Sequence, residues 1–303
     1  MTAKRTLVVV NPAAGSGAAM RRWSALRALA RASFDFDEVQ TTAPGHATSI
    51  ARDAVSAGVE RILAVGGDGT LHELVNALAS TRVALGIIPA GTGNDFARSL
   101  RLPRSEAALL RGLAQGSERR VDLGQVLGVF YLNVAGVGFD ADIARIVNAQ
   151  TVKPRGTIPY LLTAVRHAFV YVPPALALRL DQEPTGVPAP RLLVAVGNAS
   201  AYGGGMQICP GAVLDDGVLD VLIAGDLRRW ATLALLPKVF LGRHLGHPAV
   251  RLVRAQEVAV TGPAGVAVHA DGEIVGALPA TFRVCPAALS LWMPHAPDRS
   301  RAS

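Results

Sequence analysis

The chain has 303 residues, half of them hydrophobic and 17% charged, and its formal net charge is +7 at pH 7. The composition excludes an extended disordered chain, because it supplies ample apolar surface for folding, and the length favours two domains over a single core. The positive charge favours an anionic partner, which is a nucleic acid, a nucleotide or the negatively charged inner face of a membrane.

The first third of the chain alternates short aliphatic runs with longer runs rich in Ala, Leu and Arg. The short runs predict strands and the longer ones helices. Strands are expected at residues 7–10, 38–41, 61–65 and 84–88, and helices at residues 18–32, 47–57 and 71–79. This alternation is typical of a parallel sheet flanked by helices, whose ligands gather at the loops after the strands. We therefore predict an N-terminal α/β domain over residues 1–122.

Short β-rich runs separated by Pro and Gly clusters make up the rest of the chain and predict a mainly antiparallel domain over residues 123–280. Its strands are expected at residues 126–137, 175–180, 191–197, 219–224, 250–261 and 265–270, and its helices at about 158–171 and 230–241. A closing strand at about 281–296 is a candidate to return to the first domain.

The apolar runs are too short to span a bilayer, and the one after Lys4 and Arg5 is too short for a secretory signal. We therefore expect a cytoplasmic protein, in which Cys209 and Cys285 are reduced core thiols. Its basic sites are either solvated faces or contacts to anionic lipid headgroups. They include Arg21, Arg22, Arg119, Arg120, Lys153, Arg155, Arg228 and Arg229.

Two glycine-rich loops follow the first and third predicted strands. The first, residues 11–17, leads into a helix, whose N-terminal N–H groups and dipole favour a phosphate; an ordinary turn is the alternative. The second reads Gly66-Gly67-Asp68-Gly69-Thr70. Its glycines let the backbone approach phosphate oxygens, Asp68 can hold Mg²⁺, and Thr70 can cap the helix and donate to a phosphate. Both loops therefore suit nucleotide binding.

A third glycine-rich loop, residues 89–98, follows the fourth predicted strand. In it Thr92 and Asn94 are candidate nucleotide contacts, and Asp95 is a candidate cap of a helix that begins at Phe96. Because all three loops follow parallel strands, we expect them at one edge of the sheet.

Carboxylates flank a glycine in the second domain, where the sequence reads His269-Ala270-Asp271-Gly272-Glu273. Phosphoryl transfer needs a carboxylate within hydrogen-bond reach of the acceptor hydroxyl, so Asp271 and Glu273 are candidate catalytic residues. A solvated Asp-Gly hairpin is the alternative.

In the order and spacing of its three loops the chain resembles the diacylglycerol kinase catalytic family, which includes bacterial lipid kinases, sphingosine kinases and ceramide kinases. The resemblance continues through residues 197–212, with Tyr202-Gly203-Gly204-Gly205-Met206, and through residues 214–221. It implies an N-terminal α/β domain of the NAD kinase and diacylglycerol kinase type, followed by a C-terminal, mainly antiparallel β-sandwich that binds the lipid substrate.

The resemblance also implies the roles of individual residues. Glu273 would accept the proton of the lipid hydroxyl with support from Asp271, and Asp68 would act with Mg²⁺ on the phosphates. A structural Mg²⁺ is implied at Asp216 with the backbone carbonyls of Val213 and Val218, and a plain Asp-Gly turn is the alternative. Nucleotide contacts are implied, by the loops or by position, for Asn11, Pro12, Gly15, Gly17, Thr41, Gly66, Gly67, Asp68, Gly69, Thr70, Leu71, His72 and Thr92.

These features predict an ATP-dependent kinase that uses Mg²⁺ and phosphorylates a hydroxyl of a membrane lipid, either diacylglycerol or a relative such as phosphatidylglycerol. Peripheral contact with the inner face of the membrane is expected, and nucleic acid is not, because no nucleic-acid module is visible. The alternatives are a NAD kinase-like phosphotransferase and a non-catalytic nucleotide sensor. The third loop argues against the former, and the presence of Asp68, Asp271 and Glu273 against the latter. The acceptor lipid stays open, as does the oligomeric state, a homodimer included.

Overall fold

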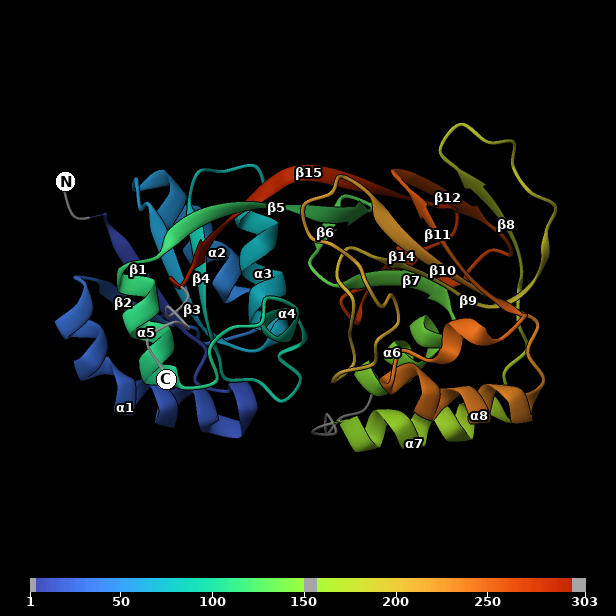
Figure 1. Cartoon of the computed structure of the whole chain (residues 1–303), viewed down its shortest axis with the longest axis horizontal. Helices are drawn as coiled ribbons and strands as arrows, with labels where there is room; N and C mark the ends of the chain where they lie inside the picture. The colour runs from blue at the N-terminus through green and yellow to red at the C-terminus, as the bar shows by residue number, and fades with distance from the viewer. Residues whose placement is uncertain (1–3, 150–156, 296–303) are drawn as a thin grey trace, which may run out of the picture. The chain divides into compact units, whose positions relative to one another are not determined.

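The structure is a computed structural model that describes residues 4–149 and 157–295, and its chain divides into two compact units (Figure 1). Unit 1 comprises the residues up to Val121 together with those from Ala287 onward, and unit 2 runs from Asp122 to Pro286. The strand β15 (Ala280–Met293) therefore contributes its first half to unit 2 and its second half to unit 1.

Unit 1 is an α/β fold, as predicted, and is built on a parallel sheet in the order β15, β4, β3, β1, β2. Aliphatic side chains fill the central strands, which is typical of strands that are buried on both faces. The strands of this sheet that precede β15 are β1 (Thr6–Val10), β2 (Asp37–Gln40), β3 (Arg61–Gly66) and β4 (Ala84–Pro89).

Helices cover both faces of this sheet. β2 and β3 lie on opposite sides of β1, so right-handed crossovers place the intervening helices on opposite faces. α1 and α5 share one core with Trp23 and Trp292, while α2 and α3 contact each other. α5 was not predicted from the sequence. It is capped by Ser105, whose hydroxyl accepts from the Ala108 N–H. The helical segments are η1 (Ala14–Gly17), α1 (Ala18–Ser33), α2 (His46–Ser56), α3 (Asp68–Leu78), α4 (Asp95–Ser99) and α5 (Glu106–Ala114).

Unit 2 is a mainly antiparallel β-sandwich, as the resemblance implied. One sheet has the order β14, β13, β7, β9, β10, β11, and the other contains β8, β12, the first half of β15, β5 and β6. The strands are β5 (Ser117–Val126), β6 (Val129–Tyr131), β7 (Val134–Gly138), β8 (Ala175–Leu180), β9 (Ala189–Gly197), β10 (Leu219–Gly225), β11 (Val250–Ala255), β12 (Glu257–Thr261), β13 (Ala267–Ala270) and β14 (Glu273–Ala277).

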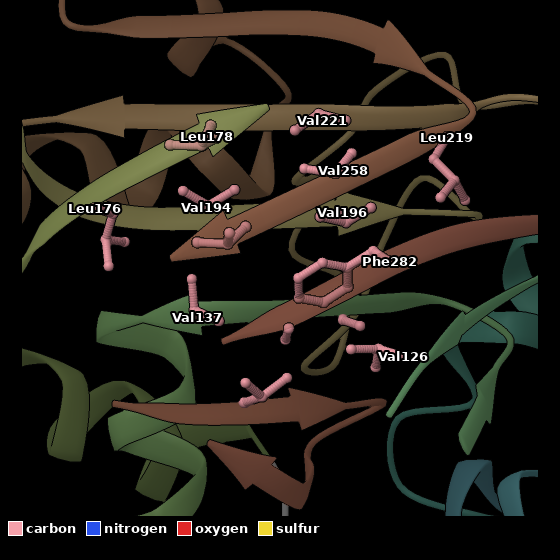
Figure 2. Close-up of a cluster of buried hydrophobic side chains, with 14 of the residues drawn as sticks. Val126, Val137, Leu176, Leu178, Val194, Val196, Leu219, Val221, Val258 and Phe282 are labelled. Atoms are coloured by element: carbon pink, nitrogen blue, oxygen red, sulfur yellow. The ribbon is translucent and has the colours of Figure 1, made fainter. Parts of the chain in front are cut away.

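Side chains from both sheets form the core of the sandwich. Figure 2 shows Val137, Val194 and Val221 from one sheet together with Val258 and Phe282 from the other. The burial of this apolar surface is the main stabilising contribution to the unit.

Two predicted strands are divided in the structure. A turn and a short connection separate β5, β6 and β7, and Gln256 separates β11 from β12.

The other face of the first sheet is covered by helices, with Leu193 and Leu222 of the sheet packed against them. α6 was not predicted, although Phe139, Ile143 and Val147 recur at the four-residue spacing of a helix face. These helices are α6 (Phe139–Asn148), α7 (Thr157–Ala168) and α8 (Arg229–Phe240), followed by the short η2 (His244–Gly246). Within the described parts of the chain, none of the helices combines the length and the apolar character needed to cross a membrane.

Candidate active site

The three glycine-rich loops of unit 1 follow β1, β3 and β4, which are neighbours in the parallel sheet. Asn11 joins the first loop to the second, because its Nδ2 donates to Thr70 Oγ1 at 2.9 Å. The same side chain shapes its own loop, since its Oδ1 accepts from the Ala13 N–H at 3.1 Å. The main chain N–H of Asn11 donates to the Val65 carbonyl at 3.0 Å. Asn11 is therefore a structural bridge between the two loops.

Glycines bring the loop backbones into direct contact. A Cβ on Gly67 would lie 2.8 Å from Gly91 Cα, and one on Gly15, where φ is +56°, would lie 2.3 Å from the Ala90 carbonyl oxygen. Side chains at these positions would push the loops apart, because the atoms they meet belong to the backbone. Gly69 differs, since a Cβ there would meet no atom within 4 Å. The packing of the protein therefore does not require glycine at position 69.

Asp68 is the first residue of α3 and is half-buried, and its Oδ1 accepts from the Phe96 N–H of the third loop at 3.3 Å. Thr70 lies inside α3, whose N-cap residue is Gly67, so the predicted capping role of Thr70 is wrong. The side chain of Leu71 is buried in the core, and its N–H donates to the Gly67 carbonyl at 3.1 Å. His72 is half-buried on the following turn.

Asn94 holds the third loop in shape. Its Oδ1 accepts from the Gly91 N–H and its Nδ2 donates to the Gly91 carbonyl, both at 2.8 Å. α4 begins at Asp95 and not at Phe96, and Asp95 forms an ion pair with Arg98 at 2.6 Å, so its predicted capping role is also wrong. These contacts are internal to the loop and stabilise its conformation.

Two further predicted nucleotide contacts lie in different surroundings. Thr92 is exposed at the tip of the third loop. Thr41 is buried after β2, and its N–H donates to the Val10 carbonyl at 2.9 Å. Of the two, only Thr92 presents its side chain to solvent.

The turn between β13 and β14 gives the two candidate catalytic carboxylates different surroundings. Asp271 Oδ2 accepts from the Leu132 N–H at 2.8 Å, and its Oδ1 accepts from the N–H groups of Asn133 at 2.8 Å and Val134 at 3.2 Å. This carboxylate therefore anchors the turn, which also explains why Asp271 is held at a φ of +50°. Glu273 is exposed at the start of β14, and no residue of the described ranges donates to its carboxylate.

A cavity of about 150 Å³ lies in unit 2 beside this turn, with Gly272 in its wall. Most of the lining is apolar and comes from α6, α7, α8 and the first sheet, but one end is polar. There His269 Nε2 lies 3.0 Å from Asp140 Oδ2, and the Tyr202 hydroxyl donates to the same oxygen at 3.4 Å. His269 and Tyr202 belong to sequence motifs but had no predicted role, and Asp140 was not among the predicted site residues. The sequence signal that could have found Asp140 is its place as an acidic residue within the helix pattern of Phe139, Ile143 and Val147.

Asp216, the predicted ligand of a structural Mg²⁺, lies in the turn before β10. Its Oδ1 accepts from the Val218 N–H at 3.3 Å, and its Oδ2 lies 3.6 Å from the Arg254 guanidinium. Arg254 also lies 3.5 Å from Asp220, where burial raises the pKa of the carboxyl and Arg254 partly opposes that rise. In the described part of the chain, no cluster of three or more His, Cys, Asp or Glu suits a metal ion. A cation at Asp216 would therefore share the carboxylate with Arg254 and depend on backbone carbonyls.

Comparison with known proteins agrees with the two-unit plan. The diacylglycerol kinase catalytic domain model matches residues 5–126, and the model of the YegS C-terminal NAD kinase beta sandwich-like domain matches residues 133–293. The chain is 33% identical to a diacylglycerol kinase of Mycobacterium tuberculosis over 298 residues, 96% of each protein. It is 30% identical to the diacylglycerol kinase of Bacillus subtilis, over 92% of this chain and 93% of that protein. At 23% identity, a crystal structure of a diacylglycerol kinase from Bacillus anthracis shares its fold, with a TM-score of 0.74 over 97% of this chain and 98% of that one.

The two matched models cover an α/β unit with three glycine-rich loops and an antiparallel sandwich, which together make up a two-domain kinase. The chain belongs to the bacterial diacylglycerol kinase and YegS-like lipid kinase family. Membership of this kinase family implies the use of ATP. The predicted class of enzyme, a lipid kinase, is thereby confirmed, and the relatives do not support the NAD kinase alternative.

Proposed function

We propose that the protein transfers the γ-phosphate of ATP to a hydroxyl of a membrane lipid of the diacylglycerol type. The observation that carries this proposal is the β13–β14 turn. Gly272 of this turn lies in the wall of an apolar cavity, and the next residue, Glu273, is exposed. An apolar cavity of about 150 Å³ holds a benzene-sized ligand, so this one has room for part of an acyl chain. Unit 2 would therefore bind the lipid and supply the proton acceptor.

Unit 1 would bind ATP through its three loops. The open space beside Gly69 admits a phosphate oxygen to the first N–H groups of α3, where the helix dipole favours negative charge. The other proposed contacts of the first two loops, at residues 11–17 and 66–72, lie on the same edge of the sheet. Two further proposed contacts are Thr41, which directly follows β2, and Thr92 in the third loop.

Asp68 would hold the catalytic Mg²⁺. Its carboxylate fits this role because it is a hard oxygen donor in the first turn of α3, next to the open position at Gly69. When bound, the ion would neutralise charge on the phosphates. A second, structural Mg²⁺ is proposed at Asp216 with the carbonyls of Val213 and Val218. There the competition from Arg254 predicts weak binding.

In the transfer step Glu273 would accept the proton of the lipid hydroxyl. The hydroxyl oxygen forms a bond to the γ-phosphorus, the bond from that phosphorus to the bridging oxygen of ADP breaks, and ADP leaves. Asp271 would contribute indirectly, because its three backbone hydrogen bonds fix the turn that carries Glu273. We therefore propose proton transfer for Glu273 and a positioning role for Asp271.

Peripheral contact with the inner face of the membrane would involve α7 and α8, which contact each other (Figure 1). α8 buries Thr232 and Leu235 and packs Ala231, Leu233 and Val239 against the core, while Trp230, Leu241 and Leu162 of α7 stay exposed. The Trp230 side chain is 74% exposed, and its ring lies edge-on to that of Phe169 with centroids 5.8 Å apart. Tryptophan is favoured at the membrane interface.

Exposed basic side chains lie on or next to α7 and α8. Because a cytoplasmic leaflet is negatively charged, these cations favour an anionic bilayer as the partner of the α7–α8 surface. The basic residues are Arg166, Arg228, Arg229 and Lys238. Lys153 and Arg155, two further candidate headgroup contacts, lie outside the described residues.

The test is transfer of labelled γ-phosphate from ATP and Mg²⁺ to diacylglycerol, phosphatidylglycerol, a sphingoid base and NAD. We expect labelled lipid from the wild type, and loss of labelling in Asp68→Ala and Glu273→Gln. Glu183→Gln is the matched control, because Glu183 is an exposed glutamate of unit 2 in a different turn. Labelled NAD without labelled lipid would establish the NAD kinase alternative. No transfer to any acceptor would favour a nucleotide sensor.

A further inference from the structure

The polar end of the cavity is a preorganised group of three side chains, Asp140, Tyr202 and His269. His269 is fully buried, and its ring is stacked on that of Tyr202, with an interplanar angle of 9°. The N–H of Gly272 donates to His269 Nδ1 at 3.3 Å, so Nδ1 carries no proton and Nε2–H donates to Asp140. A neutral histidine therefore connects Asp140 to the turn that carries Glu273.

The carboxylate of Asp140 accepts three hydrogen bonds but is not paired with a cation in the cavity. The donors are the Ala141 N–H at 2.9 Å, His269 Nε2–H and the Tyr202 hydroxyl. Of the described residues that line the cavity, none is Lys or Arg. Asp142, on the same helix and outside the cavity lining, differs because it is paired with Arg145 at 3.2 Å. The negative charge of Asp140 therefore acts on whatever enters the polar end.

We infer that Asp140 is a specificity-determining residue that selects lipids whose head group carries no phosphate. This inference rests on the proposed function. A lipid head at the polar end is accepted when it brings a hydrogen-bond donor, either a hydroxyl or an amine, to Asp140 and Tyr202. A phosphodiester brings a second negative charge next to a largely buried carboxylate, where screening by water is weak. The acceptor is therefore a neutral glycerolipid or a sphingoid base, and phosphatidylglycerol is disfavoured.

The charge at position 140 would also let the protein discriminate between lipid head groups without any difference in the shape of the cavity. The cavity wall is formed by apolar side chains such as Ile143, Val239 and Phe240, which admit the hydrocarbon of any of these lipids. Selection among lipids with similar chains must then come from the polar end, which lies beside Gly272 and is therefore next to Glu273 in the sequence. Asp140 is the charged group of the described lining at that end.

The experiment measures kcat/KM for diacylglycerol, a sphingoid base and phosphatidylglycerol in mixed micelles of one neutral detergent. The wild type should prefer diacylglycerol or the sphingoid base over phosphatidylglycerol by at least about tenfold. Asp140→Asn should reduce that preference to within about threefold, since it removes the charge with little change in shape. Asp142→Asn is the matched control and should keep the wild-type preference. Tyr202→Phe should lower kcat/KM for the preferred lipid while keeping the discrimination, because the carboxylate remains.

The wild-type measurement alone can overturn the inference, even if Asp140→Asn does not fold. Equal use of phosphatidylglycerol and diacylglycerol, or a preference for phosphatidylglycerol, would overturn it and leave the lipid kinase function intact. An unchanged preference in a folded Asp140→Asn protein would do the same. Preference for either phosphate-free lipid supports the inference and identifies the acceptor. Absence of labelled lipid in every arm would instead refute the proposed function itself.

Discussion

The two glycines that flank Asp68 have opposite surroundings, so alanine should have opposite effects at them. In Gly67→Ala the new Cβ lies 2.8 Å from Gly91 Cα, an atom of the backbone that cannot rotate away. Overpacking of this kind costs about 1–3 kcal/mol, and at about 2–4 °C per kcal/mol a loss of about 2 kcal/mol lowers Tm by about 4–8 °C.

In Gly69→Ala the added methyl group meets no atom within 4 Å, and the residue is helical. The substitution reduces the conformational entropy of the unfolded chain, which stabilises the protein by about 0.4–1 kcal/mol and raises Tm by about 1–4 °C. The same methyl group occupies the space through which a phosphate would approach the N-terminus of α3. We therefore expect ATP to bind at least about tenfold more weakly, a loss of about 1.4 kcal/mol.

Thermal unfolding monitored by circular dichroism measures the change in Tm, and calorimetric titration with ATP and Mg²⁺ measures the change in ATP affinity. The paired result, a more stable protein that binds ATP less well, separates position 69 from position 67, where we expect lower stability. Unchanged ATP affinity in Gly69→Ala would refute the assignment of the second loop to phosphate binding. A loss of stability in Gly69→Ala would refute the structural reasoning.

Three further predictions follow from contacts in unit 2. Asp271→Asn should destabilise the protein by about 1–3 kcal/mol, because an amide replaces the charged acceptor of three backbone N–H groups, whereas Glu273→Gln should leave the urea midpoint unchanged. Trp230→Glu should weaken co-sedimentation with vesicles of phosphatidylcholine and phosphatidylglycerol by about tenfold, since an inserted aromatic side chain contributes about 1.5–3 kcal/mol. The control Val187→Glu, at an 83% exposed position in the loop between β8 and β9, should leave co-sedimentation unchanged. If Trp230→Glu changes the oligomeric state instead, that surface is a protein interface. Burial lowers the pKa of His244, so the folded state takes up fewer protons than the unfolded chain below about pH 6.5. The stability that this group contributes above that pH should be lost as the pH falls, and the urea midpoint should decrease less between about pH 7.5 and 5.5 in His244→Gln than in the wild type.

Much of the fold could be predicted because its central strands are buried on both faces and appear in the sequence as aliphatic runs. The predicted strands at 61–65 and 84–88 differ from β3 and β4 by a single residue at one end. α6 was missed because Asp140 and Asp142 interrupt an apolar pattern that is clear only once Gly138 is recognised as its start. α5 was missed because it has only nine residues and adjoins a polar loop.

The candidate site could be predicted only where neighbouring residues in the sequence carry the chemistry. Glycine loops are local features, so their positions were readable before the structure was known. The pairing of His269 with Asp140 joins residues 129 positions apart, and no local pattern encodes it. Likewise, the sequence could not separate Asp271 from Glu273, because their difference depends on where the N–H groups of Leu132 to Val134 point.

The division of β15 between the units affects how the protein folds during synthesis. The parallel sheet of unit 1 gains the pairing of Ser290 and Leu291 with β4 only after all 165 residues of unit 2 have been translated. At about 5–20 residues per second the ribosome needs about 8–33 s for that stretch. During this interval β4 presents an unpaired edge, and Trp292 is missing from the core it shares with Trp23. The amino-terminal unit is therefore the first to emerge from the ribosome and the last to be completed.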